Sequence, residues 1–246
     1  MVSRFFFLFG FFLLLVFLAC QKEDLYTADP GYEYFPVGIG YWWEYQVDSI
    51  VYDPTSVEPI DSVRVYWREE VTDTLSDLAG RTIYRIDRFE RAADTSTWQI
   101  KEVVTALVEE GRATRTENNL ELIPLIFPLQ ADSRWNPTAF VDPTTIVIVA
   151  GESIELFKGW EASVKNLGEP ATVGSDTFPE TVQIALAGNE NLIELREATE
   201  IYTKGVGLVS RYWRILDTQT LDPGIPWEDK AEKGFILRQN LLNYAR

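Results

Sequence analysis

Residues 41–52, "YWWEYQVDSIVY", alternate between apolar and polar side chains. Successive side chains of a strand point to opposite faces of a sheet, so this alternation predicts a strand with one buried face. Residues 63–71 repeat the pattern. In the first segment the apolar face holds Trp43, Tyr45, Val47 and Val51; in the second, the inward positions are Val63, Val65, Trp67 and Val71.

Further segments of this kind follow, separated by residues typical of turns. Segment 144–149 is β-branched and nearly all apolar, which predicts a central strand, and Gly188-Asn189 is predicted to be a tight turn. The composition of 190–200 also fits a helix, but its position beside a turn favours a strand. The predicted strands after the first two are 82–89, 97–108, 144–149, 153–164, 181–187, 192–203, 206–217 and 234–244.

Together these segments predict an all-β protein built on a single antiparallel curved sheet, either barrel-like or a sandwich. The N-terminus is different, because residues 5–19 form an apolar run after one basic residue. A membrane-spanning helix needs about 20 apolar residues, so this run is more typical of a cleaved signal peptide. We therefore predict three parts: a lipoprotein signal peptide (1–19), a polar tether (20–31) and one all-β domain (32–246).

The single cysteine of the chain, Cys20, directly follows this run in "LACQKED". The segment resembles a bacterial lipoprotein signal, in which the cysteine is acylated and becomes the first residue of the mature chain. Ala19 fits the small residue expected before it, whereas Phe17 and Leu18 depart from the commonest pattern. Two or three acyl chains anchor a protein stably, so the resemblance implies a membrane anchor without a spanning helix. The alternative is a lone buried cysteine that follows a signal peptide cleaved at another position.

The four residues after the cysteine, Gln21, Lys22, Glu23 and Asp24, bear on which side of the membrane the protein faces. In one group of Gram-negative bacteria, a similar run acts as a signal that moves a lipoprotein across the outer membrane. The resemblance implies a protein on the outer surface of the outer membrane rather than on its periplasmic face. An ordinary charged tether is the alternative, since any solvated linker is polar.

Composition excludes several classes of function. The chain has 22 basic and 38 acidic residues; removal of 1–19 leaves 21 basic residues and a net charge of −17, so nucleic acid is not an expected partner. It contains no histidine, which excludes Ser-His-Asp and Cys-His catalysis and histidine zinc sites. If Cys20 carries lipid, thiolate chemistry is excluded too. Carboxylate catalysis and calcium binding remain.

Adjacent acidic residues occur at Glu69-Glu70, Glu109-Glu110 and Glu228-Asp229. Neighbours on a strand point to opposite faces, so such pairs are poorly placed to share an active site. We interpret them as part of a solvated acidic surface. The sequence also lacks a calcium-binding EF-hand loop, a phosphate-binding glycine loop and a G-x-S-x-G motif. We therefore predict a protein that is not an enzyme and has no cofactor or metal.

Three segments carry a resemblance to a family: 34–53, which begins with a YFPxxxGxxWxY pattern, 202–211, which contains YxxGVGLV, and 234–244. They are similar to the opening, penultimate and closing segments of small outer-membrane lipoproteins of unknown function. The resemblance implies location and architecture and supplies no catalytic residues. Gly205 and Gly207 are expected to permit a bend or bulge.

Two kinds of function fit these observations. The leading prediction is a non-enzymatic surface module that binds a glycan, a peptide or a partner protein of the outer membrane, with Trp42 and Trp227 as candidate contacts. Trp42 is predicted to point away from Trp43, and Trp227 lies in "DPGIPWEDK". Ordinary packing against a loop is the alternative for both tryptophans. The second kind of function is a barrel-like carrier of a lipid or another apolar ligand.

Overall fold

The structure is a computed structural model and describes residues 29–142 and 144–246. The predicted signal peptide, Cys20 and the run Gln21 to Asp24 lie outside the described residues. The elements in chain order are η1 (Tyr32–Tyr34), β1 (Trp42–Tyr52), β2 (Ile60–Ser76), β3 (Thr82–Arg91), β4 (Gln99–Val108), β5 (Arg112–Glu117), β6 (Leu120–Ile126), β7 (Arg134–Trp135), β8 (Val147–Val149), β9 (Glu152–Ile154), β10 (Ala162–Val173), β11 (Asp176–Glu190), β12 (Glu194–Thr203), β13 (Gly207–Asp217), α2 (Trp227–Lys230) and β14 (Lys233–Ala245). Within this described part, no helix is long and apolar enough to cross a membrane.

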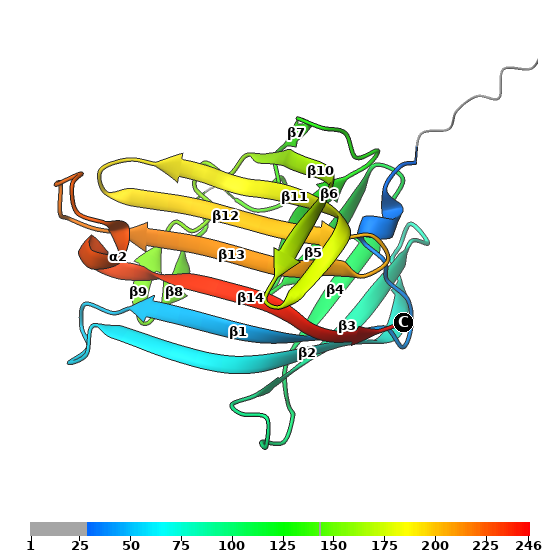
Figure 1. The fold of residues 1–246 in the computed structure, drawn as a ribbon, viewed down its shortest axis with the longest axis horizontal. Coiled ribbons are helices and arrows are strands. Elements are labelled where there is room, and N and C mark those ends of the chain that lie inside the picture. The colour runs from blue at the N-terminus through cyan, green and yellow to red at the C-terminus, as the bar shows by residue number, and fades with distance from the viewer. Residues whose placement is uncertain (1–28, 143) are drawn as a thin grey trace, which may run out of the picture.

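Twelve of these strands form one antiparallel sheet in the order β6-β5-β4-β3-β2-β1-β14-β13-β12-β11-β10-β7. The sheet curves until it is nearly closed, as a barrel is (Figure 1). The remaining two strands, β8 and β9, form a separate hairpin. The prediction of an all-β protein with a single curved antiparallel sheet is confirmed.

The two edges of the sheet are linked through β6 and β7. The indole Nε1 of Trp135 on β7 donates to the carbonyl oxygen of Ile123 on β6 at 2.7 Å. The Ile123 amide in turn donates to the carbonyl oxygen of Pro137 at 2.8 Å. Unpaired strand edges are a liability in sheet proteins, and these contacts cover both edges at the point where the barrel nearly closes.

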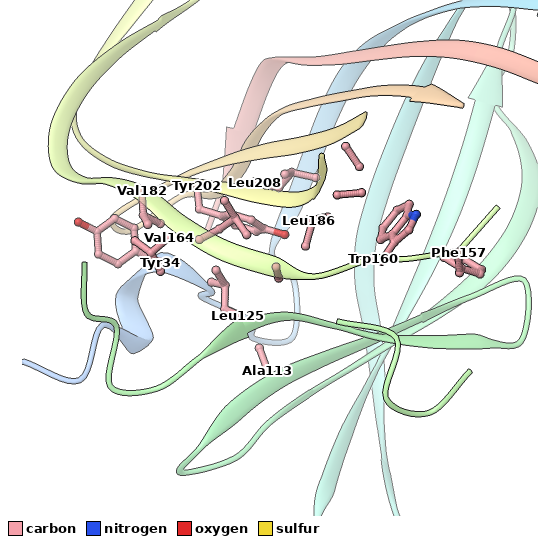
Figure 2. Packing of buried hydrophobic residues seen from close by; sticks show 14 of the residues in the cluster. Tyr34, Ala113, Leu125, Phe157, Trp160, Val164, Val182, Leu186, Tyr202 and Leu208 are labelled. Atoms are coloured by element: carbon pink, nitrogen blue, oxygen red, sulfur yellow. The ribbon is translucent and has the colours of Figure 1, made fainter. Parts of the chain in front are cut away.

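The main hydrophobic core fills the space inside this curve. Figure 2 shows Ala113 and Leu125 of the β5–β6 hairpin facing three side chains on strands β10, β11 and β12, which are Val164, Val182 and Tyr202. A second cluster surrounds Trp43, Tyr45 and Val47 of β1, so the predicted inward face of residues 41–47 is buried. The predicted inward positions Trp43, Tyr45, Val47 and Val71 are therefore confirmed, whereas Val51 is half-buried and the prediction for Val63, which is 42% exposed, is wrong.

The opening and penultimate segments of the resemblance contact each other directly. Nε1 of Trp43 donates to the carbonyl oxygen of Val206 at 2.6 Å, and the Tyr45 hydroxyl donates to that of Leu208 at 3.1 Å. Gly207 has φ 97°, a conformation that favours glycine, and a Cβ there would lie 3.4 Å from Pro36. The glycines and aromatic residues of these segments thus join β1 to the start of β13.

The structure corrects three details of the predicted strands. Residues 144–149 do not form a central strand, because only β8 is extended and it pairs solely with β9. Residues 153–164 are interrupted between β9 and β10, where Gly159 has φ 68°. Gly188 and Asn189 lie within β11; the turn follows them at Asn191, whose side chain accepts hydrogen bonds from the next amides. By contrast, the preference for a strand over a helix is confirmed: β12 begins at Glu194, two residues later than predicted, and ends at Thr203.

Candidate functional site

A row of buried charged side chains crosses the interior of the β2–β4 wall. Glu69, Arg88 and Glu102 are cross-strand neighbours on β2, β3 and β4. Nε and Nη2 of Arg88 lie 2.8 and 2.6 Å from Oε1 of Glu69, and Nη1 donates to Glu102. The Arg88 guanidinium also stacks on the Trp67 ring, 4.4 Å from its centroid. Two carboxylates therefore hold one arginine that is almost completely buried.

A second charged pair lies on another part of the sheet, the wall formed by β12 and β13. There Glu200 on β12 and Arg211 on β13 are cross-strand neighbours. Nε of Arg211 donates to Oε1 of Glu200 at 2.6 Å, and the hydroxyl of Tyr202 donates to Oε2 of the same carboxylate. All three side chains are buried. Both oxygens of Glu200 therefore already have donors.

Strand β5 joins the two walls through Arg115 and Glu117. Nη2 of Arg115 donates to Glu69 at 2.6 Å, and its Nε donates to Glu117. Glu117 also lies 3.0 Å from Nη2 of Arg88 and 3.3 Å from Nη2 of Arg211. We call this group the interior ion network; its members are Glu69, Arg88, Glu102, Arg115, Glu117, Glu200 and Arg211.

The network keeps two of its buried carboxylates, those of Glu69 and Glu117, ionised. Burial raises the pKa of Glu117, but Arg211, Arg88 and Arg115 outweigh that effect and hold the pKa well below its ordinary value. Burial likewise raises the pKa of Glu69, and Arg115 and Arg88 lower it below the ordinary value. Burial raises the pKa of the Tyr202 hydroxyl, and the neighbouring Glu200 adds to the rise. Glu69 and Glu117 are thus anions and Tyr202 is a neutral donor.

A cavity of about 350 Å³ lies beside the network, inside the barrel. Its walls are mainly apolar, and Figure 2 shows three of their side chains, Leu186, Trp160 and Phe157. Asn118 and Ile148 also line it and are exposed, Ile148 by 62%, so the cavity reaches the surface between the β5–β6 turn and β8. The charged lining residues are Arg115, Glu117, Glu200 and Arg211.

Two tryptophans give the cavity an aromatic wall. The rings of Trp160 and Trp213 meet edge to face, 5.3 Å apart, and Phe157 packs on Trp160 at 5.1 Å. Arg211 lies 5.0 Å from the centroid of the Trp213 ring. The cavity therefore passes from an apolar, aromatic region to a charged floor, an arrangement suited to binding a molecule with one polar end.

The structure places the two predicted contact tryptophans apart from this cavity. Trp42 is half-buried on the outer face of β1, with the guanidinium of Arg68 4.5 Å from its ring centroid. Trp227 is only 7% exposed, and its Nε1 donates to Glu190 at 2.8 Å. In α2 it packs with Tyr52, Leu195, Leu216 and Ile236. The position of Trp227 fits the packing alternative.

Sequence reasoning missed the residues that line the charged floor. The sequence predicts that Glu69 belongs to a solvated surface, but Glu69 is 1% exposed, whereas Glu70 points outward as strand alternation requires. The expectation was wrong for Glu69 because arginines on β3 and β5 compensate its charge. The sequence pattern predicts no strand in residues 112–126, although they contain β5 and β6 and supply Arg115 and Glu117.

Comparisons with known proteins identify no family. No protein-family model matches the chain, and no curated protein matches it. Among solved structures, the chain is similar to a "putative lipoprotein" from Parabacteroides distasonis ATCC 8503, with a TM-score of 0.40 and 13% sequence identity. The match covers 86% of this chain and 98% of that chain. A likeness this distant gives none of the cavity residues a role.

Among residues 29–142 and 144–246, no group of three or more acidic or cysteine side chains is arranged to hold a metal ion.

Proposed function

We propose that the protein is a lipid-anchored protein of the outer membrane whose barrel binds a small, mainly apolar ligand. Cys20 is the proposed lipid attachment site, and Gln21 to Asp24 are proposed to direct the protein to the outer surface. The observation that carries the binding proposal is the cavity of about 350 Å³ between the sheet and the β8–β9 hairpin.

The cavity has the properties of a ligand site. Sites for small molecules are typically about 300–1,000 Å³, mostly apolar, and contain a few convergent polar groups. Here Trp160, Trp213 and several aliphatic side chains form the walls, and two arginines lie at the floor. Barrel-like folds commonly bind ligands in their interior, reached from one end. The carrier function, ranked second from sequence, is therefore the one that the geometry favours.

The carboxylates of the floor support binding rather than catalysis. A glycosidase acid needs a carboxyl whose pKa is raised, so that it carries a proton at neutral pH. The pKa of Glu117 is instead held well below its ordinary value, and both oxygens of Glu200 accept hydrogen bonds. We accordingly propose a non-enzymatic protein.

A second candidate function, a module that contacts a glycan or a partner protein, is favoured by one feature of the outer face. There, one aromatic side chain on β1, one on β2 and one just before β4 are each stacked with an arginine. Arg91 lies 5.3 Å from the ring centroid of Tyr66 and 4.4 Å from that of Trp98, and Arg68 covers Trp42. Arginine and aromatic side chains are enriched in binding hot spots.

Blocking the cavity tests the proposed function. A fluorescent apolar probe is titrated into the purified protein, and its emission reports entry into an apolar site. Leu122→Trp on β6 and Val147→Trp on β8 fill the cavity from separate elements and should weaken binding, whereas Leu78→Trp in an exposed turn should not. Thermal unfolding establishes that each variant is folded. Equal probe binding by all four proteins would contradict the proposal.

A further inference from the structure

The described chain starts at Asp29, which is fixed to one end of the barrel. Its carboxylate lies 3.2 Å from Nζ of Lys204, the residue that directly follows β12. A few residues later, the Tyr32 hydroxyl donates to the carbonyl oxygen of Glu110, in the turn between β4 and β5, at 3.0 Å. The start of the described chain is therefore held where β12 ends and β5 begins, and we call this the η1 end.

The mouth of the cavity, between the β5–β6 turn and β8, lies toward the other end of the barrel. Just after β9, the carbonyl oxygen of Glu155 accepts from Nε of Arg196 at 3.0 Å. Nζ of Lys158 donates to Glu194, the first residue of β12, at 2.8 Å. The β8–β9 hairpin, which carries the mouth residue Ile148, is thus attached near the start of β12. Figure 1 shows this hairpin and the blue η1 helix toward opposite ends of the barrel.

Strand lengths give the separation of the mouth from the η1 end. An antiparallel strand rises about 3.4 Å per residue, so β12, with ten residues from Glu194 to Thr203, spans about 34 Å. The β5–β6 hairpin has its base at Gly111 and Phe127, and the Phe127 ring packs on Tyr32 of η1. Asn118 lies at the far end of this hairpin, about 20 Å along β5. Both sides of the mouth are therefore remote from the η1 end.

The reach of the chain before Asp29 decides which end of the barrel can face the membrane. Asp29 is the ninth residue after Cys20, the proposed lipid site, and nine residues span at most about 32 Å when fully extended. Turning the mouth end toward the bilayer would require the chain to run back along the whole of β12, about 34 Å, which exceeds this reach. The η1 end reaches the membrane without such a return.

Two exposed apolar residues mark the two ends of the barrel. Val57 and Leu78 lie in the turns before and after β2, a strand of 17 residues, and both are fully exposed. Arg81, in the turn of Leu78, lies 2.8 Å from the carboxylate of Glu109 in the β4–β5 turn, which places Leu78 at the η1 end. Backbone pairing across β1, β14 and β13 places Val57 at the end where β12 starts. Since both ends expose apolar side chains, the position of the anchor distinguishes them.

From this geometry we propose that the η1 end rests on the lipid surface that holds the anchor, and that the cavity mouth opens toward water. The ligand is then exchanged with the aqueous side rather than with the lipids beneath the barrel. This inference rests on the proposed function, both its lipid anchor and its ligand cavity. It adds the orientation of the barrel and the route of its ligand.

Fluorophores on single introduced cysteines measure the orientation. The lipidated full chain is anchored to vesicles that carry a quencher on their lipid headgroups, where only fluorophores close to the membrane surface are quenched. Leu78→Cys, Val57→Cys and Asn118→Cys are labelled in turn, since an acylated Cys20 offers no free thiol. We expect the label at Leu78 to lose most of its emission and the labels at Val57 and Asn118 to keep theirs.

The outcomes separate the orientation from the anchor. Quenching at Val57 or Asn118 as strong as at Leu78 would overturn the proposed orientation, and so would the absence of quenching at all three positions. Flotation of the parent protein with the vesicles checks the anchor itself. If the parent protein stays in solution, the proposed anchor fails, and the orientation fails with it.

Release of the fluorescent apolar probe tests the ligand route. Excess cyclodextrin, a soluble acceptor, removes the probe from the vesicle-anchored protein and, in a parallel sample with the same vesicles, from the unanchored Cys20→Ala variant. A mouth that opens toward water predicts equal release rates. Much slower release from the anchored protein would overturn the aqueous route. If the probe binds neither protein, the proposed ligand cavity fails and the route fails with it, while the quenching experiment still decides the orientation.

Discussion

Glu117 on β5 and Arg211 on β13 are 94 residues apart in the chain, yet Oε1 of Glu117 lies 3.3 Å from Nη2 of Arg211 inside the barrel. Glu117 also contacts Arg88 and Arg115, so one carboxylate connects three strands of the sheet. Through it, the β5–β6 hairpin is tied to the opposite wall. The ion network is therefore part of the structure of the barrel as well as the floor of its cavity.

Removal of one network arginine should be strongly destabilising. In Arg211→Met the carboxylates of Glu200 and Glu117 lose a buried counter-charge, and breaking a buried ion pair typically costs about 3–5 kcal/mol. Arg64→Met is the control, because Arg64 pairs with Asp48 on the exposed outer surface, where a pair is worth about 0–1 kcal/mol. Urea unfolding gives the free energy of unfolding of both variants. Similar losses of stability would mean that the buried ion pairs of the network contribute no more to stability than an exposed ion pair does.

Stability should decline in acid. The pKa values of Glu69 and Glu117 are lower in the folded protein than their ordinary value of 4.5, so the unfolded chain binds more protons in that range. The stabilisation is fully present above about pH 5 and is lost as the pH falls toward the folded pKa values. Measuring the free energy of unfolding between about pH 7 and pH 3 checks this. In Glu117→Gln the decline should be shallower, and an unchanged slope would contradict the assignment.

Adjacent tryptophans on β1 should respond differently to truncation. Trp43 is 6% exposed and donates to the Val206 carbonyl, so Trp43→Ala should cost about 3–5 kcal/mol, as loss of a buried aromatic side chain does. Trp42 lies half-buried on the outer face against Arg68, and Trp42→Ala should cost much less. Denaturant unfolding of the two variants measures the free energy of unfolding that each substitution removes. Equal destabilisation would mean that both faces of β1 are comparably buried in solution.

The lipid anchor is tested at Cys20. The Cys20→Ala variant should be released as soluble protein, whereas the parent should partition into detergent. If both partition alike, the anchor lies elsewhere.

A separate variant tests the side of the membrane. Replacing Lys22, Glu23 and Asp24 with alanine should protect the domain from protease added to intact cells while its amount stays constant. Continued cleavage of the triple variant would rule out an export role for these residues.

The fold could be predicted from sequence because its strands show period-two patterning wherever one face is apolar. Residues 41–47 follow this pattern, and so does the inward series Val65, Trp67 and Val71 on β2. That same series places Glu69 on the interior face. The sequence nevertheless predicts a surface position for Glu69, because an isolated carboxylate is costly to bury and the arginines that compensate its charge are distant in sequence.

The cavity floor could not be predicted because β5 lacks an apolar face in its sequence. The segment "RATRTE" puts Ala113, Arg115 and Glu117 on one face and Arg112, Thr114 and Thr116 on the other. Both faces contain polar residues, which is typical of a loop. Only the folded sheet brings Arg115 and Glu117 against Glu69 and Arg211. Likewise, the apolar composition of residues 144–149 reflects β8 beside the cavity rather than a central strand.

The most direct test of the account is mass spectrometry of the molecules extracted from the protein after gentle purification from its own membrane. The account predicts one class of small, mainly apolar molecule, present in stoichiometric amount in the parent protein and in Leu78→Trp, and depleted in Leu122→Trp and Val147→Trp. Recovery of the same molecules in equal amount from the cavity-filled variants, or of no bound molecule from the parent, would contradict it.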